Sequence, residues 1–393
     1  MATPKLKLGN DKWATKQRSL LAYNDEGNNF KSLPFNVERL SGGSYVGRNG
    51  LVQYAASEEP RIDFTNYSKG ALLLEPQRTN YCLNSNNASQ WSTLISNGTV
   101  TKTGNYATAP DGTQTATRLQ ASVTGSGYAV LFPSTTSISG NYSLSVYVKS
   151  NTGSSQSVAF YGRNTTLSTY TVTNEWQRLE LSGSQTGSEN SYLIVGINTS
   201  VGTPDNPIDI LVWGGQIEAG DYSTSLIPST ASAATRVQDL VTDGGNEYVI
   251  NNTAGTLFLD CELAARGTSS VHSRVLICRD TSTTTRIILD DFAGNWRVLL
   301  YSGNVDASPT IVASSANTRI KLAITYDNTG VKYSYNGNTA VFTSGPFVPS
   351  TTMNKIKFSN AAENGSFFNG WVNDLQYFDE VLTDAELKTL TTL

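Results

Sequence analysis

Short runs of alternating apolar and polar residues, separated by glycine, asparagine and serine, are the feature that most restricts how this chain can fold. In residues 143–149 the apolar side chains of Leu144, Val146 and Val148 would lie on one face of an extended strand, with polar side chains on the other. The same pattern recurs at residues 158–161, 176–181, 192–195 and 208–213. A period of two in short segments with frequent turn residues predicts antiparallel β-sandwiches rather than a helical fold.

The last third of the chain shows the same alternation. The segment 319–335 contains two alternating runs joined by the turn residues 327–330, and the dipeptide Asn336-Gly337 follows directly. Asn-Gly between strand-like runs is a strong hairpin signal, because both residues accept the backbone conformation of a tight turn. This segment therefore predicts a β-meander.

One short helix is expected at the end of the chain. Thr383 and Glu386 have the spacing of a capping box, in which the threonine hydroxyl accepts from the third helical amide and the glutamate reaches back to the cap. Leu382 and Leu387 lie where a hydrophobic staple needs them.

The length of 393 residues predicts two or three domains. Residues 1–80 lack a sustained periodicity but contain many aromatic residues, so we expect an extended segment with few regular elements that serves as an attachment arm. We place a first sandwich at residues 81–232, a linker at 233–250 and a second sandwich at 251–393. The predicted fold class is all-β, an extended N-terminal arm followed by two antiparallel β-sandwich domains.

Charge and composition exclude several functions. Lys and Arg number 28 and Asp and Glu 32, a net charge of −4 without long runs of one sign, so binding to nucleic acid is not expected. His272 is the sole histidine, which argues against a Ser-His-Asp triad and against histidine metal sites. Cys82, Cys261 and Cys278 are widely spaced and are expected to be buried thiols.

The sequence contains no apolar run of the roughly 18 residues that a membrane-spanning helix needs. The first ten residues lack the apolar core of a signal peptide, so we expect neither membrane insertion nor ordinary secretion. A polar, strand-rich chain without an export signal is expected to leave the cell by lysis, which is the route of a virion.

Two segments resemble segments that recur in bacteriophage structural proteins of the fibre and tail type. They are Gly70-Ala-Leu-Leu-Leu-Glu-Pro-Gln-Arg-Thr-Asn80 with Asn84-Ser-Asn and Gln90-Trp91, and Trp213-Gly-Gly-Gln-Ile-Glu-Ala-Gly220 with Tyr222-Ser-Thr-Ser-Leu-Ile-Pro-Ser-Thr230 and Ala234-Thr-Arg236. Between these segments the chain is similar to jelly-roll carbohydrate-binding modules, with Asn174-Glu-Trp-Gln-Arg178 at a strand start.

The C-terminal region resembles a concanavalin A or laminin-G sandwich. The matching segments are Gly255-Thr-Leu-Phe258, Ile324-Thr-Tyr-Asp327, Tyr335-Asn-Gly337, Phe368-Asn-Gly-Trp-Val372 and Leu382-Thr-Asp-Ala-Glu-Leu387. Fold resemblance does not determine function, because both sandwich types occur in lectins, enzymes and structural modules.

The resemblance implies a structural fibre or decoration protein on the surface of a bacteriophage virion, either a head fibre or a tail fibre. Its N-terminal arm would bind capsid or tail proteins, its distal sandwich would bind a host-surface glycan, and it would be a homotrimer. The chain is not expected to be an enzyme. The alternatives are an isolated carbohydrate-binding lectin and, less favoured, a glycan depolymerase.

A sugar site needs an aromatic platform with nearby hydrogen-bonding side chains. In the C-terminal sandwich the candidates for carbohydrate binding are Trp296, Tyr301, Tyr335, Trp371, Asn373 and Tyr377, and packing in the core is the alternative for each. Trp91, Trp176 and Trp213 are expected to be structural.

No catalytic residue, metal ligand or cofactor is predicted. Ca²⁺ is the one alternative, because Asp290-Asp291 and Asp327-Asn328 could supply hard oxygen ligands. Turn formation explains Asp327 and Asn328 without a metal.

Overall fold

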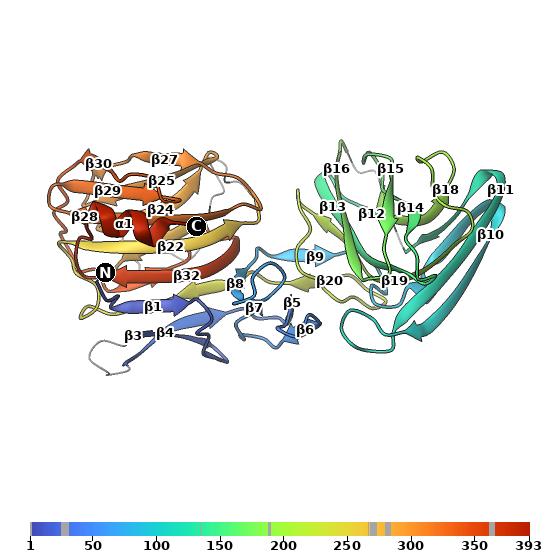
Figure 1. Cartoon of the computed structure of the whole chain (residues 1–393), viewed down its shortest axis with the longest axis horizontal. Coiled ribbons are helices and arrows are strands. Elements are labelled where there is room, and N and C mark those ends of the chain that lie inside the picture. The colour runs from blue at the N-terminus through green and yellow to red at the C-terminus, as the bar shows by residue number, and fades with distance from the viewer. Residues whose placement is uncertain are drawn as a thin grey trace. The chain divides into compact units, whose positions relative to one another are not determined.

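A computed structural model describes residues 2–24, 31–133, 135–187, 190–265, 267, 273–279, 284–360 and 366–393. Strands dominate this part of the chain, and its one α-helix is α1 (Asp384–Thr391) (Figure 1). The predicted all-β class is confirmed. The chain divides into two compact units. The terminal unit contains Met1–Gly50, Ala55–Pro76 and Val237–Leu393, and the inserted unit contains Leu51–Tyr54 and Gln77–Arg236.

The terminal unit contains a twelve-stranded and a six-stranded sheet. The path through the first is β21 (Leu240–Thr242), β4 (Lys31–Glu38), β3 (Ser19–Asn24), β1 (Leu6–Gly9), β32 (Gly370–Phe378), β22 (Gly255–Leu263), β28 (Arg319–Asp327), β29 (Gly330–Tyr335) and β30 (Val341–Ser344). Off this path, β2 (Thr15–Lys16) pairs with β3, and β8 (Ala71–Leu74) pairs with β32 and β7 (Ile62–Asp63). The predicted meander is present as β28, β29 and β30.

The six-stranded sheet follows the order β26 (Val305–Ala307), β25 (Asn295–Tyr301), β24 (Arg286–Phe292), β23 (Arg274–Cys278) and β31 (Lys355–Lys357), with β27 (Thr310–Ala313) on β25. One apolar core contains residues of both sheets, such as Leu259 and Leu375 from the first and Val275 and Leu300 from the second. Alternate residues along each strand enter this core, which is the physical basis of the period of two in the sequence.

Helix α1 starts at the predicted capping box. The Thr383 side chain accepts from the Glu386 amide at 3.3 Å, and a Glu386 carboxylate oxygen accepts from the Thr383 amide at 3.1 Å. Leu382 and Leu387 are buried with Phe258 of β22, so the helix packs on the side of the sheet opposite the main core. No described helix has the length and apolar character needed to cross a membrane.

The expectation of few regular elements in residues 1–80 is corrected. β1 pairs with β32 from Leu6↔Tyr377 to Gly9↔Asp374, and β8 pairs with the same strand at Leu72↔Val372. These strands are only four residues long and their partner lies about 300 residues or more away in the sequence. Such short strands leave no periodic signal, because their order comes from the partner strand rather than from local pattern.

The inserted unit contains an eight-stranded antiparallel sheet and a smaller pair. Its path is β15 (Ser168–Val172), β14 (Gln156–Tyr161), β18 (Ile194–Asn198), β11 (Ala116–Phe132), β19 (Ile208–Ala219), β13 (Gly140–Ser150) and β16 (Gln177–Gln185), with β10 (Ser92–Ala107) on β11. β12 (Thr135–Ser137) pairs with β17 (Asn190–Tyr192). The core includes Leu144, Val146 and Val148, the face predicted to be buried. Short elements elsewhere are η2 (Ala88–Gln90), β5 (Gly43–Val46) and β6 (Val52–Ala55).

Strands near the two ends of the inserted unit pair with each other. β9 (Arg78–Asn80) pairs with β20 (Ala234–Arg236), a strand inside the expected linker 233–250. Asn80 is fully buried, and its side chain makes four hydrogen bonds to the backbone of Cys82, Gly215, Ile217 and Ile227. β9 and β20 therefore lie where the chain enters and leaves the inserted unit.

The terminal unit contains a buried ionic cluster, which consists of Arg39, Arg61, Glu75 and Asp239. Asp239 pairs with Arg39 at 2.8 Å and with Arg61, and Arg61 pairs with Glu75 at 2.6 Å. All four side chains are at most 5% exposed. Buried charges are tolerated only when they are paired and hydrogen-bonded, so this cluster requires all its members.

Candidate functional site

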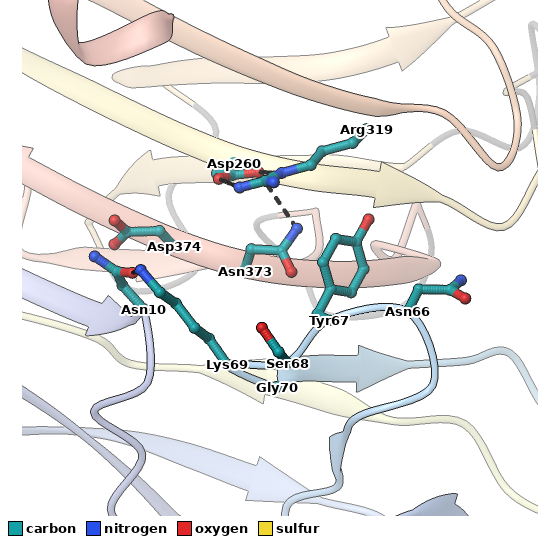
Figure 2. A pocket seen from close by; sticks show the side chains of 10 residues that line it. All are labelled: Asn10, Asn66, Tyr67, Ser68, Lys69, Gly70, Asp260, Arg319, Asn373 and Asp374. Carbon is teal, nitrogen blue, oxygen red and sulfur yellow. Dashed lines mark hydrogen bonds and ion pairs between the residues drawn. The ribbon is translucent and has the colours of Figure 1, made fainter. Parts of the chain in front are cut away.

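A polar pocket of about 260 Å³ lies on the terminal unit (Figure 2). Its lining residues come from two distant parts of the sequence: Asn10, Asn66, Tyr67, Ser68, Lys69, Gly70, Asp260, Arg319, Asn373 and Asp374. Asp260 lies between two core residues of β22, so its side chain is on the face of the sheet turned away from the main core. The N-terminal segment supplies one wall, and the long strands β22, β28 and β32 supply the other.

An ion pair and an amide fix the sheet side of the pocket. Arg319 donates to both carboxylate oxygens of Asp260, at 2.8 Å from Nε and 2.5 Å from Nη2, and Asn373 Nδ2 donates to the same carboxylate at 3.3 Å. The hydrogen bonds to Asp260 raise the pKa of Arg319. In Figure 2 the Asn373 side chain points toward this pair. A bidentate pair holds both planar groups in one orientation, so these side chains are preorganised.

A β-bulge places Asn373 in the pocket. Asp260 pairs with Asp374, but the next residue of β22, Cys261, pairs with Val372. Asn373 is therefore the extra residue of β32, and a bulge of this kind redirects a side chain from the regular alternation.

The loop wall is held by contacts of Tyr67 and Lys69. The Tyr67 hydroxyl donates to Glu262, and its ring lies 5.7 Å from the Arg319 guanidinium carbon. Burial raises the pKa of Tyr67, so the hydroxyl stays protonated. Lys69 Nζ donates to Asn10 Oδ1 at 2.8 Å, and the Trp13 indole donates to the Lys69 carbonyl at 2.8 Å. The loop is therefore tied to both the sheet and β1.

Gly70 ends this loop where a side chain would not fit. Its φ is +73°, and a Cβ atom there would lie 2.7–2.9 Å from side-chain atoms of Phe64 and Ile62. Glycine alone combines this left-handed conformation with the close approach.

Asp374 is the one strongly perturbed acid of the pocket. It is 6% exposed, one oxygen accepts from Gln376 at 2.7 Å, and the other has no hydrogen-bond partner among the described residues. Burial raises its pKa to about 6, and the positive charges of Lys7 and Lys321 oppose this shift only in part. A perturbed acid in a concave polar site is typical of functional rather than purely structural positions.

Asp374→Asn is expected to stabilise the terminal unit in a pH-dependent manner. The folded-state pKa of Asp374 lies above its ordinary value of 3.8, so the stability associated with its protonated form is complete below about pH 4 and is lost as the pH rises through about 6. The variant should therefore gain about 1–3 kcal/mol at pH 8 and nothing at pH 3.5. Thermal unfolding of both proteins across this range measures the difference, and a gain that is independent of pH would contradict it.

The structure places the predicted sugar-binding residues at separate positions. Asn373 lines the pocket. Trp296 and Tyr377 are a correction, because they are 1% and 0% exposed in the core and cannot present a ring to a ligand. Tyr335 packs against that core. Trp371, on β32, pairs with Glu262 of β22 and is not among the residues that line the pocket.

Tyr301 lies on the other sheet, 4.7 Å from the guanidinium carbon of Arg286. Trp91 and Trp213 are buried and Trp176 is half-buried in the inserted unit. His272 lies outside the described residues.

The carboxylates considered for Ca²⁺ are engaged elsewhere. Asp290 pairs with Arg274 and Arg297, Asp291 accepts from Ser314 at 2.7 Å, and Asp327 accepts from Thr329 in its own turn. Within the described ranges no three His, Cys, Asp or Glu side chains are grouped as a metal site would need.

The pocket residues that the sequence did not reveal are mostly polar. Tyr67, Lys69, Asp260 and Arg319 show no shared motif or spacing. The one available signal was Asn373-Asp374, two consecutive polar residues inside a largely apolar strand.

No protein-family model matches this chain, and no curated protein matches it. Among solved structures, it is similar to the CBM40 module of the Ruminococcus gnavus IT-sialidase bound to α2,3 sialyllactose, with 15% identity, a TM-score of 0.32 and coverage of 36% of this chain and 84% of that one. Domain 4 of AbnA, a GH43 extracellular arabinanase from Geobacillus stearothermophilus, has 15% identity and a TM-score of 0.32. This match covers 44% of this chain and 84% of that one. Domains LG4-5 of the mouse laminin α1 chain have 9% identity and a TM-score of 0.27, and the match covers 65% of this chain and 89% of that one. Values this low assign no function to this chain.

Proposed function

We propose that this chain is a glycan-binding protein and that the pocket beside β32 binds one sugar residue. The observation that carries the proposal is the composition of the lining: a tyrosine ring, amide side chains, and two carboxylates balanced by Arg319 and Lys69. Sugars need hydrogen-bonding partners for adjacent hydroxyls together with an apolar contact, and a charge-balanced site suits a neutral sugar.

The same geometry favours binding over hydrolysis. A glycosidase needs two carboxyl groups free to act as acid and as nucleophile or base. Both oxygens of Asp260 accept from Arg319, and Asp374 is 6% exposed with one oxygen held by Gln376. These contacts support a binding protein without enzymatic activity.

Asn373→Ala is expected to weaken glycan binding by about tenfold or more, because it removes the amide that lies beside the Asp260–Arg319 pair on the sheet side of the pocket. Asn338→Ala, the same change at an exposed turn of the same unit, serves as the control. A glycan array identifies the ligand, and calorimetric titration then compares the three proteins. The proposal fails if the array shows no ligand, or if Asn373→Ala binds as tightly as Asn338→Ala.

We further propose that the chain is displayed as a trimeric fibre or decoration protein on a bacteriophage virion. The support is the resemblance of residues 70–80 and 213–236 to fibre and tail proteins. The described N-terminal strands use their edges to pair within the terminal unit, so attachment to a capsid or tail protein would have to use their exposed side chains. Light scattering of the purified chain tests the trimer, since a monomer of 42.3 kDa would contradict it.

A further inference from the structure

The outward face of the six-stranded sheet concentrates positive charge. Residues paired directly across antiparallel strands share a face, and Val275, Ile287 and Leu300 direct the opposite face into the core. The positions of β31, β23, β24 and β25 on this face therefore carry five basic side chains and one acidic one, of which Lys357 and Asp290 are buried: Arg274, Arg286, Arg297, Lys355, Lys357 and Asp290. In a chain with a net charge of −4, this is a local excess of positive charge.

The acidic groups at this face are already engaged. Asp290 is shared by Arg274 at 3.0 Å and Arg297 at 2.8 Å. Lys355 pairs with Asp243 at 2.6 Å. These carboxylates are therefore committed to cations other than Arg286.

Arg286 is the cation that this arrangement leaves without a carboxylate in the described part of the chain. Its Nε atom is buried without an acceptor, and its guanidinium carbon lies 4.7 Å from the centre of the Tyr301 ring. Burial, and after it the neighbouring charge of Arg274, lowers the pKa of Arg286. Burying part of a cation without a counterion costs free energy, and an anion bound at this position would offset that cost.

We propose that Arg286, stacked on Tyr301 and next to the strand that carries Arg274, binds a carboxylate or sulfate group of an acidic polysaccharide. The planar guanidinium matches both groups through paired hydrogen bonds. Nucleic acid fits less well, because it needs a dense stripe of unpaired cations, whereas most cations of this face are already paired. The site is independent of the pocket beside β32, where Asn373 lies.

The test uses the full chain and four probes: polygalacturonate for carboxylate, dextran sulfate for sulfate, neutral dextran, and a DNA oligonucleotide. Arg286→Gln should weaken binding of at least one acidic polysaccharide by about tenfold. Arg286→Lys should retain part of the affinity, because it keeps the charge but not the planar fork. Lys332→Gln on β29, where Lys332 pairs with Asp384, changes the net charge equally and should leave binding unchanged.

The pattern of results decides the proposal. If Arg286→Gln loses affinity for one acidic polysaccharide, the charged group of that polysaccharide is the one that Arg286 binds. If it loses affinity for both, Arg286 binds carboxylate and sulfate groups alike. Equal loss in Arg286→Gln and Lys332→Gln, binding of the DNA as tight as that of the polysaccharides, or no binding of either polysaccharide overturns it. Thermal unfolding of Arg286→Gln verifies folding, and Asn338→Ala, at an exposed turn outside the pocket, should bind the acidic polysaccharides normally.

Discussion

Replacing Asn80 by alanine should lower the free energy of unfolding of the inserted unit by about 3–5 kcal/mol. The Asn80 side chain donates to the carbonyls of Gly215 and Ile227 at 3.1 and 2.8 Å and accepts from the amides of Cys82 and Ile217 at 2.9 and 3.0 Å. Alanine leaves these four groups without this partner in a region where Asn80 itself has no exposure. The penalty for unsatisfied buried groups exceeds the net gain from forming such bonds.

Urea unfolding and scanning calorimetry each measure this loss. The unfolding transition of the inserted unit should shift to lower urea concentration and lower temperature, while that of the terminal unit should stay unchanged. Asn80→Asp should also destabilise, because a carboxylate cannot donate to the two carbonyls. Asn174→Ala, at an exposed turn of the same unit, should change the stability by less than about 0.5 kcal/mol. Equal effects at positions 80 and 174 would show that the buried amide is not a structural requirement.

Replacing Asp239 by alanine should destabilise the terminal unit by about 3–5 kcal/mol. Its carboxylate pairs with Arg39 and Arg61 and accepts from the Glu75 amide at 3.0 Å. Both guanidinium groups have no exposed side-chain surface, so the variant would leave two cations with one carboxylate in the interior. Removing one member of a buried ionic cluster costs more than the cluster contributes, because the remaining charges stay desolvated.

Asp379→Ala is the matched control for this variant. Asp379 forms a partly exposed pair with Lys5 at 3.7 Å, and such pairs contribute at most about 1 kcal/mol. Chemical denaturation of the two variants gives the comparison. If Asp239→Ala unfolds at the same denaturant concentration as Asp379→Ala, the cluster does not hold the N-terminal segment to the C-terminal sandwich.

Local pattern was sufficient for several elements. The alternating run at 143–149 forms β13, the run at 319–326 lies in β28, and Thr383 with Glu386 starts α1. Each of these signals lies within a few residues of the element it forms, so it can be recognised without knowledge of any partner strand.

The pocket could be predicted only in part, because its members share no local pattern. Asn373 was found from its position between aromatic residues, but the β-bulge that turns it toward Asp260 depends on the register of β22 against β32. Trp296 and Tyr377 have the composition of a sugar platform but are buried in the core. Sequence identifies an aromatic residue, whereas burial depends on which face of the strand meets the second sheet.

The alternation of short apolar and polar runs by itself determined an all-β chain, because only extended strands sort side chains with a period of two. Tertiary structure decided that residues 2–24, 31–50 and 55–76 belong with the C-terminal sandwich, and that Tyr67 and Lys69 face Asp260 and Arg319 across a pocket. Pairing between strands far apart in sequence depends on burial and on hydrogen bonds supplied by the partner, and neither is encoded in the neighbouring residues.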